Sequence, residues 1–388
     1  AFLAPGNPFG STPTLSAPRQ RSAAMPDSED GAHRFEPPLS TMAASVVRNP
    51  IRKVMLKMKA TPGCISLAGG RPPACVFPAR AREVGEDLMN YGPQLAVGTD
   101  GLREWAREFV DKFHAPPGGW KGRDVLLTSG NTDGMTKAVM LLSDPGDYVI
   151  ADEVTYPGIT ASAVPLGRRV LGVRMDADGM VPDALAAAVE GICGGGGSTA
   201  GTDVSAGRPR LLYLTPHGQN PTGATLPNAR KEALYAVARR FGLTILEDDP
   251  YYFLNLTPRE PGAPLEPGDM RGIGDAPKSF LSMDTDGRVV RLDSVSKVFA
   301  PGYRIGWVTA GKAVIDKWAV LGEVLTWSLS GVQQSAFLAL LQDLGTDGFD
   351  EHLKQLQSDY ARRCAFLVKA CDRHLQGLCT WRVPDFGM

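Results

Sequence analysis

Residues 289–309 read VVRLDSVSKVFAPGYRIGWVT, and this stretch decides the fold. The runs at 289–292 and 305–309 are short, apolar and rich in β-branched residues, as buried strands are. A polar turn joins them and carries Ser294, Ser296, Lys297 and Arg304. Two buried strands that flank such a turn bring several polar side chains to one edge of a sheet.

The same alternation extends along the chain from about residue 100. Short apolar runs predict strands at 124–129, 148–151, 170–175, 211–214 and 243–247. Apolar residues at helical spacing predict helices at 102–113, 135–142, 182–190, 230–241 and 349–375. Strands separated by helices require right-handed crossovers, so we expect an α/β fold with a mainly parallel sheet covered on both faces.

The charge balance and the apolar pattern exclude several classes of function. The 388 residues include 41 Lys plus Arg and 42 Asp plus Glu, a net charge of −1. Nucleic-acid-binding proteins usually carry a strongly basic face, so no nucleic-acid partner is expected. No run of about 18 apolar residues occurs, so no membrane-spanning helix is expected. The six cysteines form no CxxC pair, so no metal site is expected.

The first 40 residues are expected to precede the folded part of the chain. They are rich in Pro, Gly, Ser and Ala, and no acidic residue precedes Asp27. This composition is typical of an organelle transit peptide, but it also fits a disordered tail or sequence translated upstream of a start at Met25. The expected location is the cytoplasm, or a mitochondrion or plastid if the leader is a transit peptide.

Polar residues follow the predicted strands, where ligands bind in open α/β sheets. Ser129–Gly134 is a small-residue turn before a helix, which leaves backbone N–H groups free to hold a phosphate. The other strand ends carry a ring, an amide, a carboxylate, a phenol, a lysine and an arginine: Tyr156, Asn220, Asp248, Tyr251, Lys297 and Arg304. The four glycines at 194–197 lack a following Lys-Ser or Lys-Thr, and we interpret them as a surface insertion.

This set of groups matches the needs of pyridoxal phosphate. The cofactor needs a lysine amine for a Schiff base with its aldehyde, and a carboxylate beside its pyridine nitrogen. Its phenolic oxygen needs donors such as an amide and a tyrosine hydroxyl. Its phosphate needs an arginine, hydroxyls and free backbone amides. Each residue alone has an ordinary structural explanation, and the ordered set at strand ends is what indicates the cofactor.

Longer strings of residues resemble a known family. The stretch from Ser294 to Gly306 is similar to the lysine signature of the fold-type I, class I/II aminotransferases, and so are Gln219–Gly223 and Glu247–Phe253. Three further strings resemble one branch of this family, which holds fungal aromatic aminotransferase and kynurenine/2-aminoadipate aminotransferase. They are Arg48–Arg52, Ile65–Gly70 and Phe280–Arg288. The resemblance implies a three-layer αβα large domain with a mainly parallel sheet, plus a smaller α+β domain.

The resemblance also implies a role for each matching residue. Lys297 is expected to be the Schiff-base lysine and proton carrier, and Asp248 to pair with the pyridine nitrogen. Tyr156 is expected to stack on the ring, and Asn220 and Tyr251 to hydrogen-bond its oxygen. Expected phosphate contacts are Asn131, Thr132, Ser294, Ser296, Arg304 and, from the neighbouring subunit of a homodimer, Tyr91. Expected substrate contacts are Gly70, Arg52 and Asn220.

The family also suggests domain boundaries. A leader at 1–40 and an N-terminal segment at 41–75 are expected before the large cofactor-binding domain at 76–345. Residues 346–388 are expected to begin the small domain, which in family members continues for several tens of residues. That continuation carries the arginine that grips the substrate α-carboxylate, so no residue here is assigned that role and the small domain is expected to be truncated.

The expected function is ping-pong transamination. The amino donor would be an aromatic amino acid, kynurenine or 2-aminoadipate, and the acceptor a 2-oxo acid such as 2-oxoglutarate. A lyase or decarboxylase on the same fold is an alternative, because the cofactor residues alone do not exclude it. Two further alternatives are a regulator-like domain that binds the cofactor, and an incomplete protein chain that binds the cofactor but has little activity. A regulator would carry a basic winged-helix module before this domain, which the Pro-rich leader does not match.

Overall fold

The computed structural model describes residues 54, 57, 61–64, 97–194, 207–258, 275–326 and 328–388. All of them belong to one compact unit, Ser40–Met388. The leader, and with it the expected transit-like segment, lies outside the described residues. So do Arg52, Gly70 and Tyr91 and most of the glycine-rich insertion.

A mainly parallel sheet forms the centre of the described part of the chain. In spatial order its strands are β1 (Arg123–Thr128), β9 (Gly306–Gly311), β8 (Val289–Ser294), β7 (Thr244–Asp248), β6 (Pro209–Leu214), β2 (Tyr148–Asp152) and β3 (Arg169–Val173). Within this sheet β9 runs antiparallel to both of its neighbours, and the other pairs are parallel. A separate hairpin pairs β4 (Met175–Asp176) with β5 (Gly179–Met180). The predicted sheet type is confirmed.

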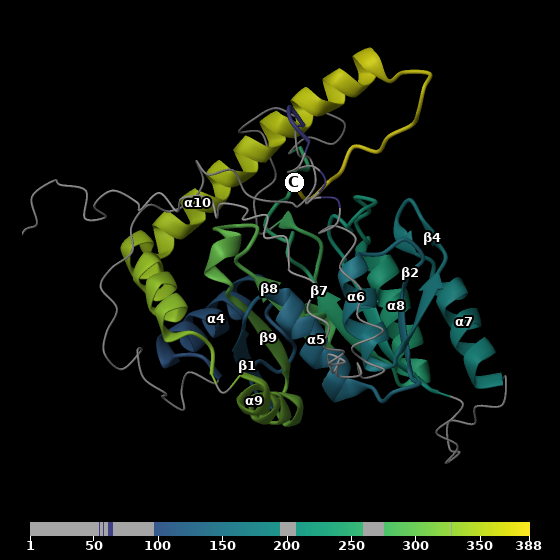
Figure 1. The fold of residues 1–388 in the computed structure, drawn as a ribbon, viewed down its shortest axis with the longest axis vertical. Coiled ribbons are helices and arrows are strands. Elements are labelled where there is room, and N and C mark those ends of the chain that lie inside the picture. Colours follow the sequence, from purple (N-terminus) through teal and green to yellow (C-terminus); the bar gives the residue numbers. More distant parts are fainter. Residues whose placement is uncertain are drawn as a thin grey trace, which may run out of the picture. The chain divides into compact units, whose positions relative to one another are not determined.

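Helices cover both faces of the sheet, which makes three layers (Figure 1). One face packs against α5 (Asn131–Leu142), α6 (Pro157–Ala163) and α9 (Lys312–Thr326). The other packs against α4 (Asp100–Phe113), α7 (Pro182–Gly194), α8 (Asn228–Phe241) and the first part of α10 (Gly331–His374). Short 3₁₀ turns are η3 (Val164–Leu166), η5 (Leu281–Met283) and η6 (Pro301–Tyr303). All six residues of β8 are buried, as expected for a strand in the middle of a doubly covered sheet.

Several helix boundaries differ from the sequence prediction, among them those of α5 and α10. Helix α5 begins at Asn131 rather than Met135, because Gly130 (φ 80°) turns the chain sharply into the helix. Asn131 and Thr132 therefore belong to the first helical turn. The predicted helix at 349–375 is the second part of α10, which already begins at Gly331 and is interrupted at Gly345 (φ 62°).

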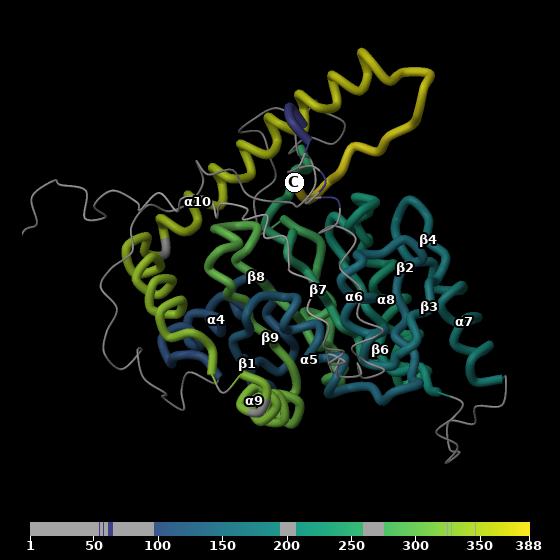
Figure 2. The backbone as a smooth tube through the Cα atoms, viewed as in Figure 1, coloured from purple at the N-terminus to yellow at the C-terminus, as the bar shows by residue number. Residues whose placement is uncertain are grey.

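The C-terminal residues return to the large domain after α10, as the tube in Figure 2 shows. Phe386 is buried and forms an antiparallel bridge with Asn255. The Leu256 amide donates to the Asp385 carbonyl at 2.7 Å, and the Gly387 amide donates to the Leu254 carbonyl at 3.0 Å. These contacts join residues 385–387 to residues 254–256.

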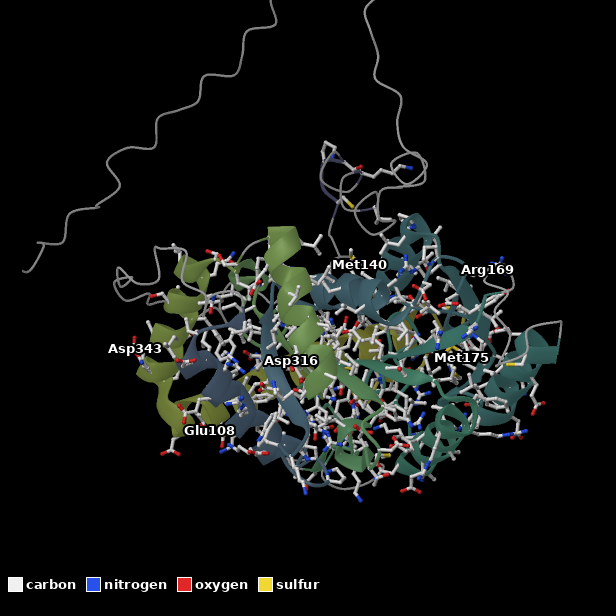
Figure 3. All side chains as sticks on the ribbon, turned by 90° about the horizontal axis from the view of Figure 1, so that it is seen from below. Glu108, Met140, Arg169, Met175, Asp316 and Asp343 are labelled. Atoms are coloured by element: carbon white, nitrogen blue, oxygen red, sulfur yellow. The ribbon has the colours of Figure 1, made fainter. Side chains whose placement is uncertain are left out.

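Outside the core, charged side chains such as Glu108 on α4, Arg169 on β3 and Asp343 on α10 point outward (Figure 3).

Among the described helices, none is both long and apolar enough to cross a membrane.

A buried ionic cluster connects β7, β8 and the start of η5 near the carboxyl ends of the two strands. Arg291 has no exposed surface and bonds Asp293 at 2.8 Å, Asp249 at 3.0 Å and Glu247 at 3.1 Å. The Glu247 carboxylate also accepts hydrogen bonds from the backbone amides of Phe280 (2.8 Å) and Leu281 (3.1 Å). One guanidinium therefore compensates three carboxylates inside the protein.

Helix α8 and the loop after β6 join the same cluster. Burial lowers the pKa of His217 to about 4, so this imidazole is neutral. Its Nδ1 donates to Asp249 at 2.9 Å, while its Nε2 accepts from Lys231 Nζ, also at 2.9 Å. The loop that carries Asn220 is thus anchored to the end of β7.

Replacing Arg291 tests this cluster. We expect Arg291→Met to lower the free energy of unfolding by about 3–5 kcal/mol, because the variant leaves buried carboxylates without a counter-charge. The deficit should be smaller at about pH 5 than at about pH 8, because protonated carboxyls need no counter-charge. Urea denaturation followed by circular dichroism measures both. The control is Lys312→Met, which breaks an exposed ion pair with Asp316 and should leave the transition midpoint unchanged. Equal shifts in both variants would contradict the account.

Candidate active site

Ten of the sequence-predicted site residues line one cavity of about 300 Å³. They come from the ends of β7 and β8, the start of α5 and the loops after β2, β6, β7 and β8. The ten residues are Asn131, Thr132, Tyr156, Asn220, Asp248, Tyr251, Ser294, Ser296, Lys297 and Arg304. The remaining three, Arg52, Gly70 and Tyr91, lie outside the described residues.

Asp248 lies at the end of β7, on the sheet face opposite the ionic cluster. Its carboxylate accepts two side-chain hydrogen bonds, from Asn131 Nδ2 to Oδ1 at 2.6 Å and from the Tyr213 hydroxyl to Oδ2 at 2.7 Å. Burial raises the pKa of Asp248, and these two hydrogen bonds act against the rise. The side chain is 4% exposed and lines the cavity, so it can present a carboxylate to a bound cation.

The start of α5 and Arg304 form an anion-binding corner. Asn131 and Thr132 are the first two residues of the helix, where backbone N–H groups have no partner within the helix and the helix dipole is positive. Arg304 Nη2 donates to the Ser129 carbonyl at 2.9 Å, which holds the guanidinium beside this helix start. A Cβ at Gly130 would lie 2.8 Å from Arg304 Nη2, so glycine is needed there for the two groups to approach.

Two serines and a lysine complete the wall that β8 and its turn provide. Ser294 Oγ accepts a hydrogen bond from the Ser296 backbone amide at 3.1 Å, which fixes the turn before Lys297. Burial lowers the pKa of Lys297, while the charge of Asp248 acts in the opposite direction. A lowered pKa increases the fraction of neutral amine, the form that attacks a carbonyl carbon.

Two tyrosines complete the cavity wall. The Tyr156 ring lies over Gly158, because a Cβ at residue 158 would be 2.1 Å from that ring. Tyr251 is hydrogen-bonded to Asn220, and burial raises its pKa to about 12, so its hydroxyl keeps its proton at neutral pH. Asn220 and Tyr251 can therefore act as paired donors to one oxygen.

The cavity also contains residues that the sequence did not single out: Met135, Tyr213, Thr215, Pro250 and Pro301. Of these five, Tyr213 is the one whose side chain hydrogen-bonds a predicted site residue among those described. It belongs to the apolar run of β6, where an aromatic residue is normally part of the core. One property of the sequence could have pointed to Tyr213: a tyrosine in a buried strand usually has a hydrogen-bond partner for its hydroxyl.

Comparison with known proteins places the chain in a family. Residues 66–384 match aminotransferase class I and II. The chain belongs to the class I and II aminotransferases. It is 40% identical to the aminotransferase swnA of Metarhizium robertsii over 77% of this chain and 56% of that protein. It is 33% identical to the mitochondrial kynurenine/alpha-aminoadipate aminotransferase of Mus musculus, over 89% of this chain and 81% of the relative.

A solved structure supports the fold assignment. The aromatic aminotransferase Aro9 from Candida albicans superimposes with a TM-score of 0.67 at 28% identity, over 76% of this chain and 62% of that one. The chain thus spans less than two thirds of the length of both this protein and swnA. The fold is that of the fold-type I enzymes, as the resemblance implied.

Class I and II aminotransferases use pyridoxal phosphate, and the cavity residues of this aminotransferase fit it. The anion corner at Asn131, Thr132 and Arg304 suits the phosphate. The Asp248 carboxylate suits the pyridine nitrogen, and the Asn220–Tyr251 pair suits the ring oxygen. An amine of lowered pKa, Lys297, lines the same space.

Gln219 holds the loop of Asn220 against the turn that leads to Tyr156. Its Nε2 donates to the Val154 carbonyl at 2.5 Å and to Asp152 Oδ2 at 3.3 Å. Its Oε1 accepts from the backbone amide (3.0 Å) and the hydroxyl (2.6 Å) of Thr222. Both donors and both acceptor positions of this buried amide are therefore used.

The variant Gln219→Glu tests this brace. The new carboxyl loses both donors and lies beside Asp152, whose pKa burial already raises to about 7. We expect the apoprotein to bind pyridoxal phosphate about tenfold more weakly at about pH 8, with partial recovery at about pH 6, where the two carboxyls can share a proton. Fluorescence titration measures the affinity.

Gln357→Glu is the matched control for this test. Gln357 is a buried glutamine on α10 that donates to the Phe253 carbonyl at 3.2 Å and does not line the cavity. The control should change stability but not the pH dependence of binding. A Gln219→Glu protein with unchanged affinity at both pH values would rule out the brace.

Proposed function

We propose that this protein is a pyridoxal-phosphate-dependent transaminase for an amino acid with a large side chain. The amino donor is an aromatic amino acid, kynurenine or 2-aminoadipate, and the acceptor is a 2-oxo acid such as 2-oxoglutarate. Two relatives support this substrate class, since one is named for kynurenine and aminoadipate and another for aromatic substrates. The observation that carries the reaction type is that Lys297 and Asp248 line one cavity with an anion corner.

The chain's own groups divide the work. When bound, pyridoxal phosphate supplies an electron sink that stabilises negative charge at the substrate Cα. Lys297 supplies the amine for covalent attachment and afterwards carries a proton from the substrate Cα. Asp248 holds a proton on the pyridine nitrogen, and Tyr156 covers one face of the ring. Asn220 and Tyr251 orient the ring through its oxygen.

The phosphate end acts as the fixed point of the site. Arg304, Ser294, Ser296 and the first amides of α5 converge on the same corner of the cavity. Because Ser294 ends β8 and the amides begin a helix, these groups would hold the phosphate in place relative to Lys297. The substrate side of the site, with Gly70 and Arg52 as proposed contacts, is contributed by the N-terminal segment.

A homodimer and a location complete the proposal. Tyr91 is proposed to reach the phosphate of a neighbouring subunit, so that two sites are shared between two chains. We propose a cytoplasmic enzyme, or a mitochondrial or plastid one if the leader directs import. A lyase or decarboxylase is the second candidate for the chemistry, since Lys297 and Asp248 serve those reactions equally well.

The lysine chemistry is tested with the purified protein and pyridoxal phosphate. The wild-type protein should show a visible absorbance band, and borohydride should fix the cofactor covalently on Lys297, which peptide mass spectrometry locates. Lys297→Ala should abolish the band and the covalent label, because none of the other described residues that line the cavity provides a primary amine. The control Lys312→Ala, at an exposed site, should behave as wild type. A covalent label at any other lysine would contradict the assignment.

The substrate class is tested with a panel of amino donors and 2-oxoglutarate. Aromatic amino acids, kynurenine and 2-aminoadipate should convert the bound cofactor to its amino form, which absorbs at shorter wavelength, and 2-oxoglutarate should reverse the change. Release of carbon dioxide or of a side-chain fragment instead of a 2-oxo acid would favour the decarboxylase or lyase.

A further inference from the structure

The Tyr213 hydroxyl lies in the core of the protein and has one strong partner. The residue belongs to β6, is 1% exposed, and its ring packs in the apolar layer between the sheet and α5. Its hydroxyl donates to Asp248 Oδ2 at 2.7 Å, and the Thr215 hydroxyl approaches it at 3.5 Å. The strong contact therefore joins Tyr213 to the carboxylate assigned to the pyridine nitrogen.

Asn131 holds the other oxygen of the same carboxylate. Its Nδ2 donates to Asp248 Oδ1 at 2.6 Å and lies 3.3 Å from the Leu292 carbonyl. This contact fixes the orientation of the amide, because the reverse orientation would place Oδ1 against the carboxylate. Each oxygen of Asp248 thus has one donor from the protein and one lone pair left for the cavity.

The two donors also lower the pKa of Asp248 and so favour its ionised form. Burial and the neighbouring Asp249 raise its pKa, whereas the hydrogen bonds from Tyr213 and Asn131 and the charge of Arg291 lower it. Arg291 contributes from the other side of the sheet, where Glu247, Asp249 and Asp293 already surround it. A protonated Asp248 has no negative charge to stabilise a pyridinium nitrogen, so the two donors on the cavity side, which lower its pKa more than Arg291 does, matter most.

We propose that Tyr213, together with Asn131, is a positioning residue that keeps Asp248 ionised and aimed at the pyridine nitrogen. This inference rests on the proposed function. The apolar packing of the Tyr213 ring would by itself explain why the residue is buried. An experiment must therefore separate the effect of the ring from the effect of the hydroxyl. Tyr213→Phe does so, because it removes the hydroxyl and keeps the ring.

The test compares two ligands for the apoprotein. One is pyridoxal phosphate, and the other is its carbocyclic analogue with C–H in place of the ring nitrogen. Tyr213→Phe should weaken binding of pyridoxal phosphate by about tenfold, the typical effect of losing a hydrogen bond to a charged group. Binding of the analogue should be unchanged, since the analogue has no nitrogen for Asp248 to hold.

Tyr235→Phe is the matched control. The Tyr235 hydroxyl donates to the exposed Asp286 at 2.6 Å and to the buried Asp284 at 3.1 Å, a tyrosine–carboxylate contact that lies outside the cavity. The control should lower stability as Tyr213→Phe does and leave the affinity for both ligands unchanged.

Each outcome decides the question. Selective weakening for pyridoxal phosphate supports the positioning role. Equal weakening for both ligands, or no weakening for either, overturns it, because the hydroxyl then acts through packing or not at all. If the wild-type apoprotein binds neither ligand, the proposed function itself fails and this inference fails with it.

Discussion

Three consecutive buried acids stand at the end of β7: Glu247 and Asp248 are its last residues, and Asp249 follows it. The site depends on the separation of these three side chains onto the two faces of the sheet. Side chains alternate along a strand, so Glu247 and Asp249 point to the face where Arg291 compensates them. Asp248 is left on the opposite face with two neutral donors. An uncompensated row of buried carboxylates would take up protons. The cluster thus permits one carboxylate to face the cofactor cavity with its charge retained.

The sheet brings distant parts of the sequence to this carboxylate. Asn131 is 117 positions from Asp248, and Arg304 contacts a carbonyl 175 positions away. The carboxyl ends of parallel strands meet at one edge, and the start of α5 points there as well. His217 and Gln219 tie the loop of Asn220 to β7 and to the end of β2. The cofactor contacts therefore share one rigid frame, and a change in any of these ties should alter the geometry of several contacts together.

The sequence predicted the sheet type and the ten described cavity residues because both follow from local patterns. Strand ends in an α/β alternation converge by topology, so Asn220, Asp248 and Lys297 needed no knowledge of distances. Side-chain direction did not follow from these patterns. The side chain of Asn131 reaches Asp248 because α5 begins at Asn131, four residues before the predicted start. The sequence did not single out Tyr213, because it lies in an apolar run whose residues usually belong to the core. It did not single out Arg291 either, because the carboxylates that pair with a strand residue cannot be read from the sequence. The break of α10 at Gly345, where φ is 62°, was not predicted either.

An ionised Asp248 should stabilise the protonated ring nitrogen of pyridoxal phosphate in this site. Nitrogen-15 NMR of the protein loaded with ring-labelled cofactor measures this directly, because the ring nitrogen resonates in distinct regions when protonated and when neutral. We expect the protonated, pyridinium-type shift near neutral pH. A neutral pyridine shift in the wild-type protein would be the contradictory result, since it would show that Asp248 does not hold a protonated ring nitrogen.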